Sequence, residues 1–143
     1  MIGALTLSPR RGRIGLYFRT VVDGSFDGAG VARFLGQLLR HIKGRVVVVW
    51  DRWSGHGGPH VRAVLARNPR LTVERLPAYA PELNPVEYLW SHLRWSALCN
   101  FAPADATELN GAIGPVLRAS ARDQHLLRGF WAGANLRLMR CRC

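Results

Sequence analysis

The chain has few cysteines, a single lysine and no long apolar run. No stretch reaches 18 apolar residues, so we expect no membrane-spanning helix. Residues 1–9 have neither a preceding basic region nor a small-residue cleavage site, so they do not resemble a signal peptide. A length of 143 residues suits one domain, and we expect a cytoplasmic protein.

The three cysteines exclude a disulfide framework. Cys99 stands apart, whereas Cys141 and Cys143 lie among the last three residues. This spacing does not match a structural zinc site, which needs a second pair of ligands. We expect three free thiols.

Acidic residues are scarce as well. Nine acidic side chains stand against 20 basic ones, and the formal net charge is +11. This exceeds the charge of about 2–8 that usually keeps a small domain soluble. Contacts with phosphates release counterions, so the charge predicts a nucleic-acid partner, with simple solubility as the other explanation. The preference for arginine over lysine is typical of a GC-rich genome.

Hydrophobic periodicity predicts an α/β fold. The run at 46–50 is continuous and β-branched, which is typical of a strand buried on both faces. The predicted order β-β-α-β-α-β-α-α favours a mixed sheet flanked by helices, with less pattern after residue 123. The predicted strands are 2–7, 13–22, 46–50 and 71–76, and the predicted helices are 28–43, 60–67, 85–97 and 104–121.

Asp51 directly follows the strand at 46–50. The carboxyl ends of strands are where ligands bind in α/β sheets, so a carboxylate here can face a cleft. Asp is also common where a strand simply enters a turn. Position alone does not decide between these two interpretations.

Glu87 occupies the third position of the predicted helix that begins at Pro85, with Asn84 as its N-cap. By itself this position favours helix capping, in which the glutamate binds the N–H of Asn84. Taken with Asp51, it favours catalysis. Phosphoryl transfer with two divalent ions needs carboxylates that converge from different elements, and carboxylate oxygens suit Mg²⁺ or Mn²⁺.

Three further residues are candidates for contacts with DNA. His56 lies in a glycine-rich loop, where a histidine is more often a solvated polar group. Arg52 and Arg94 are candidate phosphate contacts, chosen from many arginines. Motifs for nucleotide-binding loops, serine hydrolases and zinc proteases are absent.

Residues 1–110 resemble the DDE superfamily endonuclease domain of bacterial insertion-sequence transposases related to the mariner group. The family has an Asp at a strand end, followed by Pro-x-Tyr-[Ser/Ala]-Pro-x-Leu-Asn-Pro-[Ile/Val]-Glu. Here Asp51 ends Val-Val-Val-Val-Trp-Asp, and Glu87 ends Pro-Ala-Tyr-Ala-Pro-Glu-Leu-Asn-Pro-Val-Glu, with 35 residues between them. The residue after this Asp is often Asn in the family and is Arg52 in this chain.

The resemblance implies a ribonuclease-H-like catalytic domain at 1–122, followed by a tail at 123–143. It implies Mg²⁺- or Mn²⁺-dependent cleavage of DNA at transposon ends and transfer into target DNA, by proteins that usually act as homodimers. Asp51 and Glu87 match the second and third metal-binding carboxylates.

The family's first Asp lies on a strand upstream of the segment that matches residues 1–9, and neither Asp23 nor Asp27 matches it. We therefore expect an N-terminally truncated domain that lacks its first strand and is inactive alone. A segment from an upstream reading frame is one source of the missing part. A non-catalytic DNA-binding or regulatory domain and a degenerate remnant are the alternatives.

Overall fold

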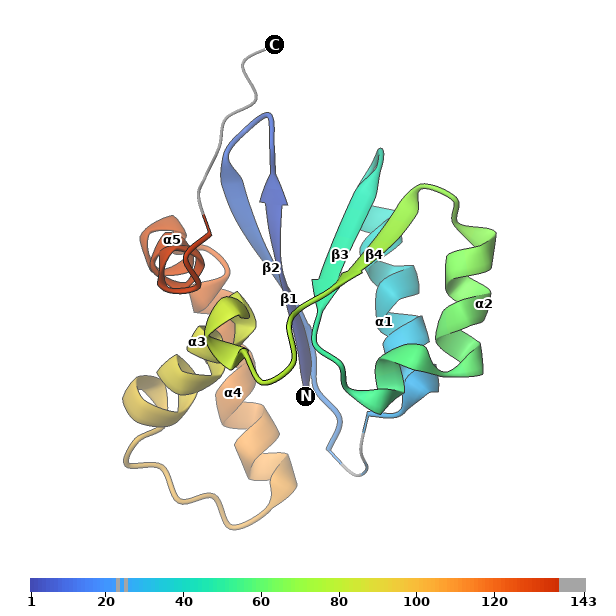
Figure 1. The fold of residues 1–143 in the computed structure, drawn as a ribbon. Coiled ribbons are helices and arrows are strands. Elements are labelled where there is room, and N and C mark those ends of the chain that lie inside the picture. Colours follow the sequence, from blue (N-terminus) through green and yellow to red (C-terminus); the bar gives the residue numbers. More distant parts are fainter. Residues whose placement is uncertain (23, 25, 137–143) are drawn as a thin grey trace.

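The computed structural model describes residues 1–22, 24 and 26–136 and has helices on both sides of short strands (Figure 1). Asp23, Cys141 and Cys143 lie outside these residues, and Cys99 is a free, exposed thiol. No helix in the described part is long and apolar enough to cross a membrane. In chain order the elements are β1 (Ile2–Ser8), β2 (Arg13–Arg19), α1 (Gly28–His41), β3 (Val46–Trp50), η1 (Ser54–Gly57), α2 (Pro59–Arg67), β4 (Leu71–Arg75), η2 (Pro81–Leu83), α3 (Pro85–His92), the π-helical turn η3 (Leu93–Ala97), α4 (Ala106–Ser120) and α5 (Gln124–Gly133).

The strands confirm the predicted α/β class and contain both antiparallel and parallel pairs. β1 and β2 form an antiparallel hairpin in which Ile2 lies opposite Arg19. β3 and β4 are parallel, with Val46 opposite Leu71. Among the described residues the four strands form two separate two-stranded sheets, and the helices flank them as expected for a ribonuclease-H-like domain.

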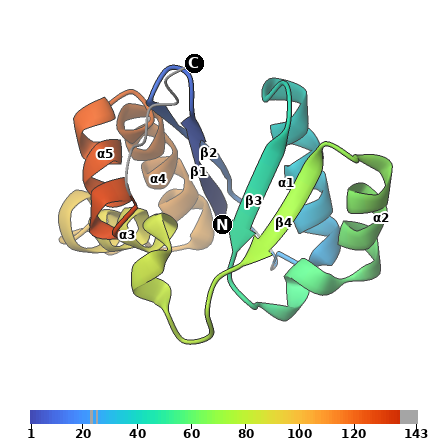
Figure 2. The same cartoon turned by 45° about the horizontal axis from the view of Figure 1, so that its top comes forward.

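The larger core lies between the β1–β2 hairpin and helices α3, α4 and α5 (Figures 1 and 2). Ile14, Leu89, Leu117 and Leu127 are completely buried in it. These side chains come from four different elements, so the core joins the hairpin to all three helices. The predicted helices at 85–97 and 104–121 are confirmed as α3 with η3 and as α4.

A second core packs α1 and α2 against one face of β3 (Figure 2). Val48 and Trp50 point toward it, whereas Val47 and Val49 are 62% and 56% exposed. The prediction that this strand is buried on both faces is therefore wrong. Side chains alternate along a strand, and the helices α1 and α2 cover only one side.

Helix α5 was not predicted, and it anchors the outer edge of β2. The Gln124 side chain accepts a hydrogen bond from the N–H of Ile14 at 3.1 Å and donates one to the carbonyl of Ile14 at 2.7 Å. One side-chain amide thus replaces a neighbouring strand at this position. The boundary predicted after residue 122 stays a prediction.

We expect Leu127→Ala to lower the free energy of unfolding by about 2–4 kcal/mol, because it leaves a cavity in the main core. His125→Ala, on the exposed side of the same helix, should change it by less than about 0.5 kcal/mol. Urea unfolding of both variants measures this difference. Equal stabilities would contradict the assignment of α5 to the core.

Candidate active site

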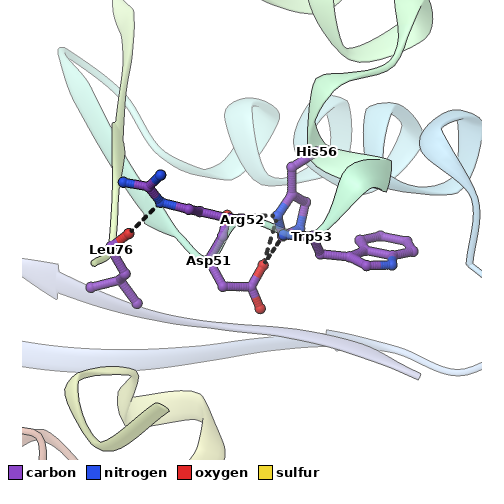
Figure 3. Close-up of polar contacts among 5 residues, drawn as sticks. All are labelled: Asp51, Arg52, Trp53, His56 and Leu76. Carbon is purple, nitrogen blue, oxygen red and sulfur yellow. Dashed lines mark hydrogen bonds and ion pairs between the residues drawn. The ribbon is translucent and has the colours of Figure 1, made fainter. Parts of the chain in front are cut away.

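The site lies where two parallel strands end at the same edge. Asp51 follows β3, and Leu76 follows β4. The N–H of Leu76 donates a hydrogen bond to the carbonyl of Trp50 at 2.8 Å, which extends the ladder by one residue. Arg52 Nε donates to the carbonyl of Leu76 at 3.4 Å (Figure 3). Both segments that leave the strands are therefore tied together at their start.

The Asp51 carboxylate is held in place through one of its two oxygens. Oδ1 accepts a hydrogen bond from the N–H of Trp53 at 3.0 Å and lies 3.1 Å from Nδ1 of His56 (Figure 3). Among the described residues, none donates a hydrogen bond to Oδ2. The side chain is 53% exposed, so Oδ2 is available to a ligand.

His56 is enclosed by aromatic rings, although a solvated position was the expected alternative. Its ring stacks on Trp50, with centroids 4.5 Å apart and planes inclined by 4°, and meets the edge of Trp53 at 5.2 Å. Only 17% of the side chain is exposed. The solvated alternative is therefore wrong, and the surrounding rings direct Nδ1 toward Asp51.

Glu87 lies at the start of α3 but does not cap that helix. The side chain of the N-cap residue Asn84 accepts from the N–H of Val86 at 3.2 Å. The N–H of Asn84 itself donates to the carbonyl of Pro81 at 2.9 Å and is not bound by Glu87. No hydrogen bond to the Glu87 carboxylate occurs among the described residues. The structure thus removes the capping explanation for this glutamate.

Asp51 and Glu87 line one pocket of about 410 Å³, together with residues 76–81 and Asn84. The pKa of Glu87 is raised above its ordinary value, first by partial burial and then by the negative charge of Asp51. Each effect disfavours the ionised carboxylate. The fold therefore places both predicted carboxylates on one pocket, close enough for the charge of Asp51 to raise the pKa of Glu87.

The predicted DNA contacts are distributed unevenly around this pocket. Arg52 lines it and also lines an adjoining hollow of about 140 Å³, which His56 and Arg75 share. Arg94 is exposed on η3 and lines neither pocket. Of the three candidates, only Arg52 and His56 lie beside Asp51.

The donor set suits a hard divalent cation but is small. Two carboxylates face the pocket, and in the described part of the chain no arginine or lysine forms an ion pair with a carboxylate. The same part holds no cluster of three or more His, Cys, Asp or Glu residues around a common centre. The chemistry of Asp51 and Glu87 is therefore compatible with Mg²⁺ or Mn²⁺, but two carboxylates do not make a complete ligand set in the part of the chain that the structure describes.

Comparison with protein families matches residues 2–110 to the DDE superfamily endonuclease family. The match covers most of the chain and includes both carboxylates, so the chain belongs to this family. No curated protein matches it. Endonucleases of this superfamily act on DNA, typically with divalent metal ions.

Sequence reasoning missed several residues of the site. Tyr79 and Asn84 line the main pocket, Arg75 lines the adjoining one, and Trp50 packs on His56. Tyr79 and Asn84 belong to the motif that ends at Glu87, so this motif is the signal that could have identified them. Nothing in the sequence indicated the stacking of Trp50 on His56, because it depends on how the chain turns after β3.

Glu87→Gln should raise the melting temperature at pH 7 in the absence of divalent ions, by about 1–3 °C. The raised pKa means that the folded chain loses stability as the pH rises through that pKa, and the variant avoids this loss. The gain should shrink as the pH falls below the raised pKa.

Thermal unfolding between pH 4 and pH 8 tests this, with Glu82→Gln as the control, since Glu82 is exposed and does not line the pocket. A gain that is the same at every pH, or one that Glu82→Gln shares, would contradict the electrostatic explanation.

Proposed function

We propose that this chain is part of the catalytic domain of a bacterial insertion-sequence transposase related to the mariner group. It acts in metal-dependent cleavage of DNA strands at transposon ends and in their transfer to target DNA. The observation that carries the proposal is the pair Asp51 and Glu87. They line one pocket at the strand ends, neither forms an ion pair with an arginine or lysine in the described part of the chain, and the charge of Asp51 raises the pKa of Glu87.

The residues of the site have separable roles in this proposal. Asp51 and Glu87 would hold the divalent ions, which would supply positive charge to stabilise the attacking and leaving oxygens. His56 and the N–H of Trp53 position Asp51 and leave Oδ2 for the metal. Arg52 attracts the DNA phosphate to the pocket, and the net charge of +11 supports binding along the duplex.

A further carboxylate completes the metal site in this proposal, and it is carried by an additional strand. β1 and β3 are the strands of the two pairs that face each other, and they are not paired with one another among the described residues (Figures 1 and 2). A strand between them would join the two pairs into one mixed sheet and would end near Asp51. The proposed source is a segment encoded in an upstream reading frame, and the active assembly is a homodimer at the bacterial nucleoid.

We expect Mn²⁺ to raise the melting temperature of the chain by binding only the folded state. At ten times the dissociation constant the gain is about 1.4 kcal/mol. Asp51→Asn and Glu87→Gln should each abolish it, and Glu82→Gln should retain it. Metal stabilisation that survives both pocket substitutions would place the ion elsewhere.

Nicking of plasmid DNA that carries the sequence flanking the coding region tests the activity. We expect little nicking by the chain alone, and Mg²⁺- or Mn²⁺-dependent nicking once the upstream-encoded polypeptide is co-expressed with it. Asp51→Asn or Glu87→Gln should reduce the restored rate by more than the roughly 10–100-fold typical for loss of an outer-shell metal partner.

DNA binding distinguishes the alternative of a non-catalytic or regulatory domain. That alternative predicts salt-dependent binding without nicking, even in the presence of the upstream polypeptide, and indifference to Asp51→Asn and Glu87→Gln. Robust metal-dependent nicking by the chain alone, abolished by Asp51→Asn, would instead show that no additional strand is needed.

A further inference from the structure

Tyr79 has an exposed ring in an unfavourable backbone conformation. Its relative exposure is 102%, so no part of the ring is packed against the chain. Its φ is 57°, in the left-handed region that residues with a Cβ rarely adopt. Asn135 is the other described non-glycine residue with positive φ, but it follows α5, where asparagine commonly ends a helix. Neither packing nor helix capping explains Tyr79.

The loop that carries Tyr79 is fixed at both ends. The N–H of Leu76 donates to Trp50, and the N–H of Leu83 donates to the carbonyl of Ala80 at 3.2 Å. Pro77 and Pro81 flank the tyrosine, and each restricts its own φ. Tyr79 therefore projects from a defined position, and this position lines the pocket of Asp51 and Glu87.

We propose that Tyr79 stacks on an unpaired nucleobase beside the phosphate held at Asp51 and Glu87. The inference rests on the proposed function, because it assumes DNA at this pocket. Arg52 lines the same pocket and supplies positive charge for the phosphate, and an aromatic face is what stacks on a base. A base within a duplex has both faces covered, so the partner is a base that is single-stranded or turned out of the helix.

The other exposed aromatic residues among those described are Trp53, Trp95 and Phe101, and Phe101, which is 36% exposed, lines neither pocket. The ring of Trp53 is 44% exposed and packs against His56 and Gly55, where a Cβ would lie 2.3 Å from it. Trp95 is 72% exposed on η3, but it does not line the pocket. Trp95 is therefore a control for aromatic exposure without proximity to the site.

Fluorescence anisotropy tests the proposal with the full chain and a labelled oligonucleotide whose duplex end bears a single-stranded overhang. The nucleotides of the overhang are replaced one at a time by abasic sites. We expect Tyr79→Ala to weaken binding about five- to a hundredfold. At one position the abasic site should weaken binding to the wild type and have no effect on Tyr79→Ala, whereas Tyr79→Phe and Trp95→Ala should behave as wild type.

Three outcomes separate the possibilities. Equal affinity and the same abasic profile for wild type and Tyr79→Ala would overturn the stacking role while leaving the proposed function intact. Absence of DNA binding by the wild type would overturn both. Weaker binding by Tyr79→Ala with an unchanged abasic profile would also overturn stacking, because the loss would not involve a base.

The unfolding temperature of a Tyr79 variant shows independently whether the substituted loop still folds. Asparagine tolerates positive φ better than tyrosine, so Tyr79→Asn should unfold at an equal or higher temperature while it loses the base-dependent part of binding. A variant that loses both stability and binding would indicate that Tyr79 supports the loop, and this would contradict a role in stacking.

Discussion

The parallel pairing of β3 with β4 is the constraint on which the site depends. Because both strands run in the same direction, Asp51 and the loop that begins at Leu76 leave the sheet at one edge. The hydrogen bond from Leu76 to Trp50 continues this pairing past the last regular residue. Glu87 follows that loop, and so two carboxylates that are distant in sequence share one pocket. An antiparallel pair would have sent them to opposite edges.

The two carboxylate oxygens of Asp51 have different surroundings. One oxygen binds the N–H of Trp53 and lies against His56, which itself is stacked on Trp50. The other oxygen, Oδ2, accepts no hydrogen bond from the described residues and is available to a ligand in the pocket. The orientation of the carboxylate is thus set by the protein before any ligand arrives, and a preorganised group does not have to be reoriented at the moment of reaction. Among the residues that the structure describes, none donates a hydrogen bond to the Glu87 carboxylate, and its pKa is raised because it is partly buried and lies near the negative charge of Asp51.

Much of the fold was accessible from the sequence because its signals are local. The β-branched run of β3 and the proline-rich segment before α3 each depend on a short stretch of chain. The predictions that were wrong or missing concern features that depend on contacts between distant elements. The open face of β3 results from which helices pack nearby, and α5 acquires its place from contacts with β2, 110 residues away at Gln124. The roles of Asp51 and Glu87 as metal ligands stay predictions.

The side-chain amide of Gln124 determines which edge of the β1–β2 hairpin is open to pairing with another strand. Ile14 uses its N–H and its carbonyl on that side chain, so the outer border of β2 is closed to another strand at this point. Along the opposite edge, β1 pairs with no other strand among the described residues. The additional strand proposed above would therefore pair along β1, on the side of β3, and at Ile14 the outer border of β2 is protected against pairing with another chain.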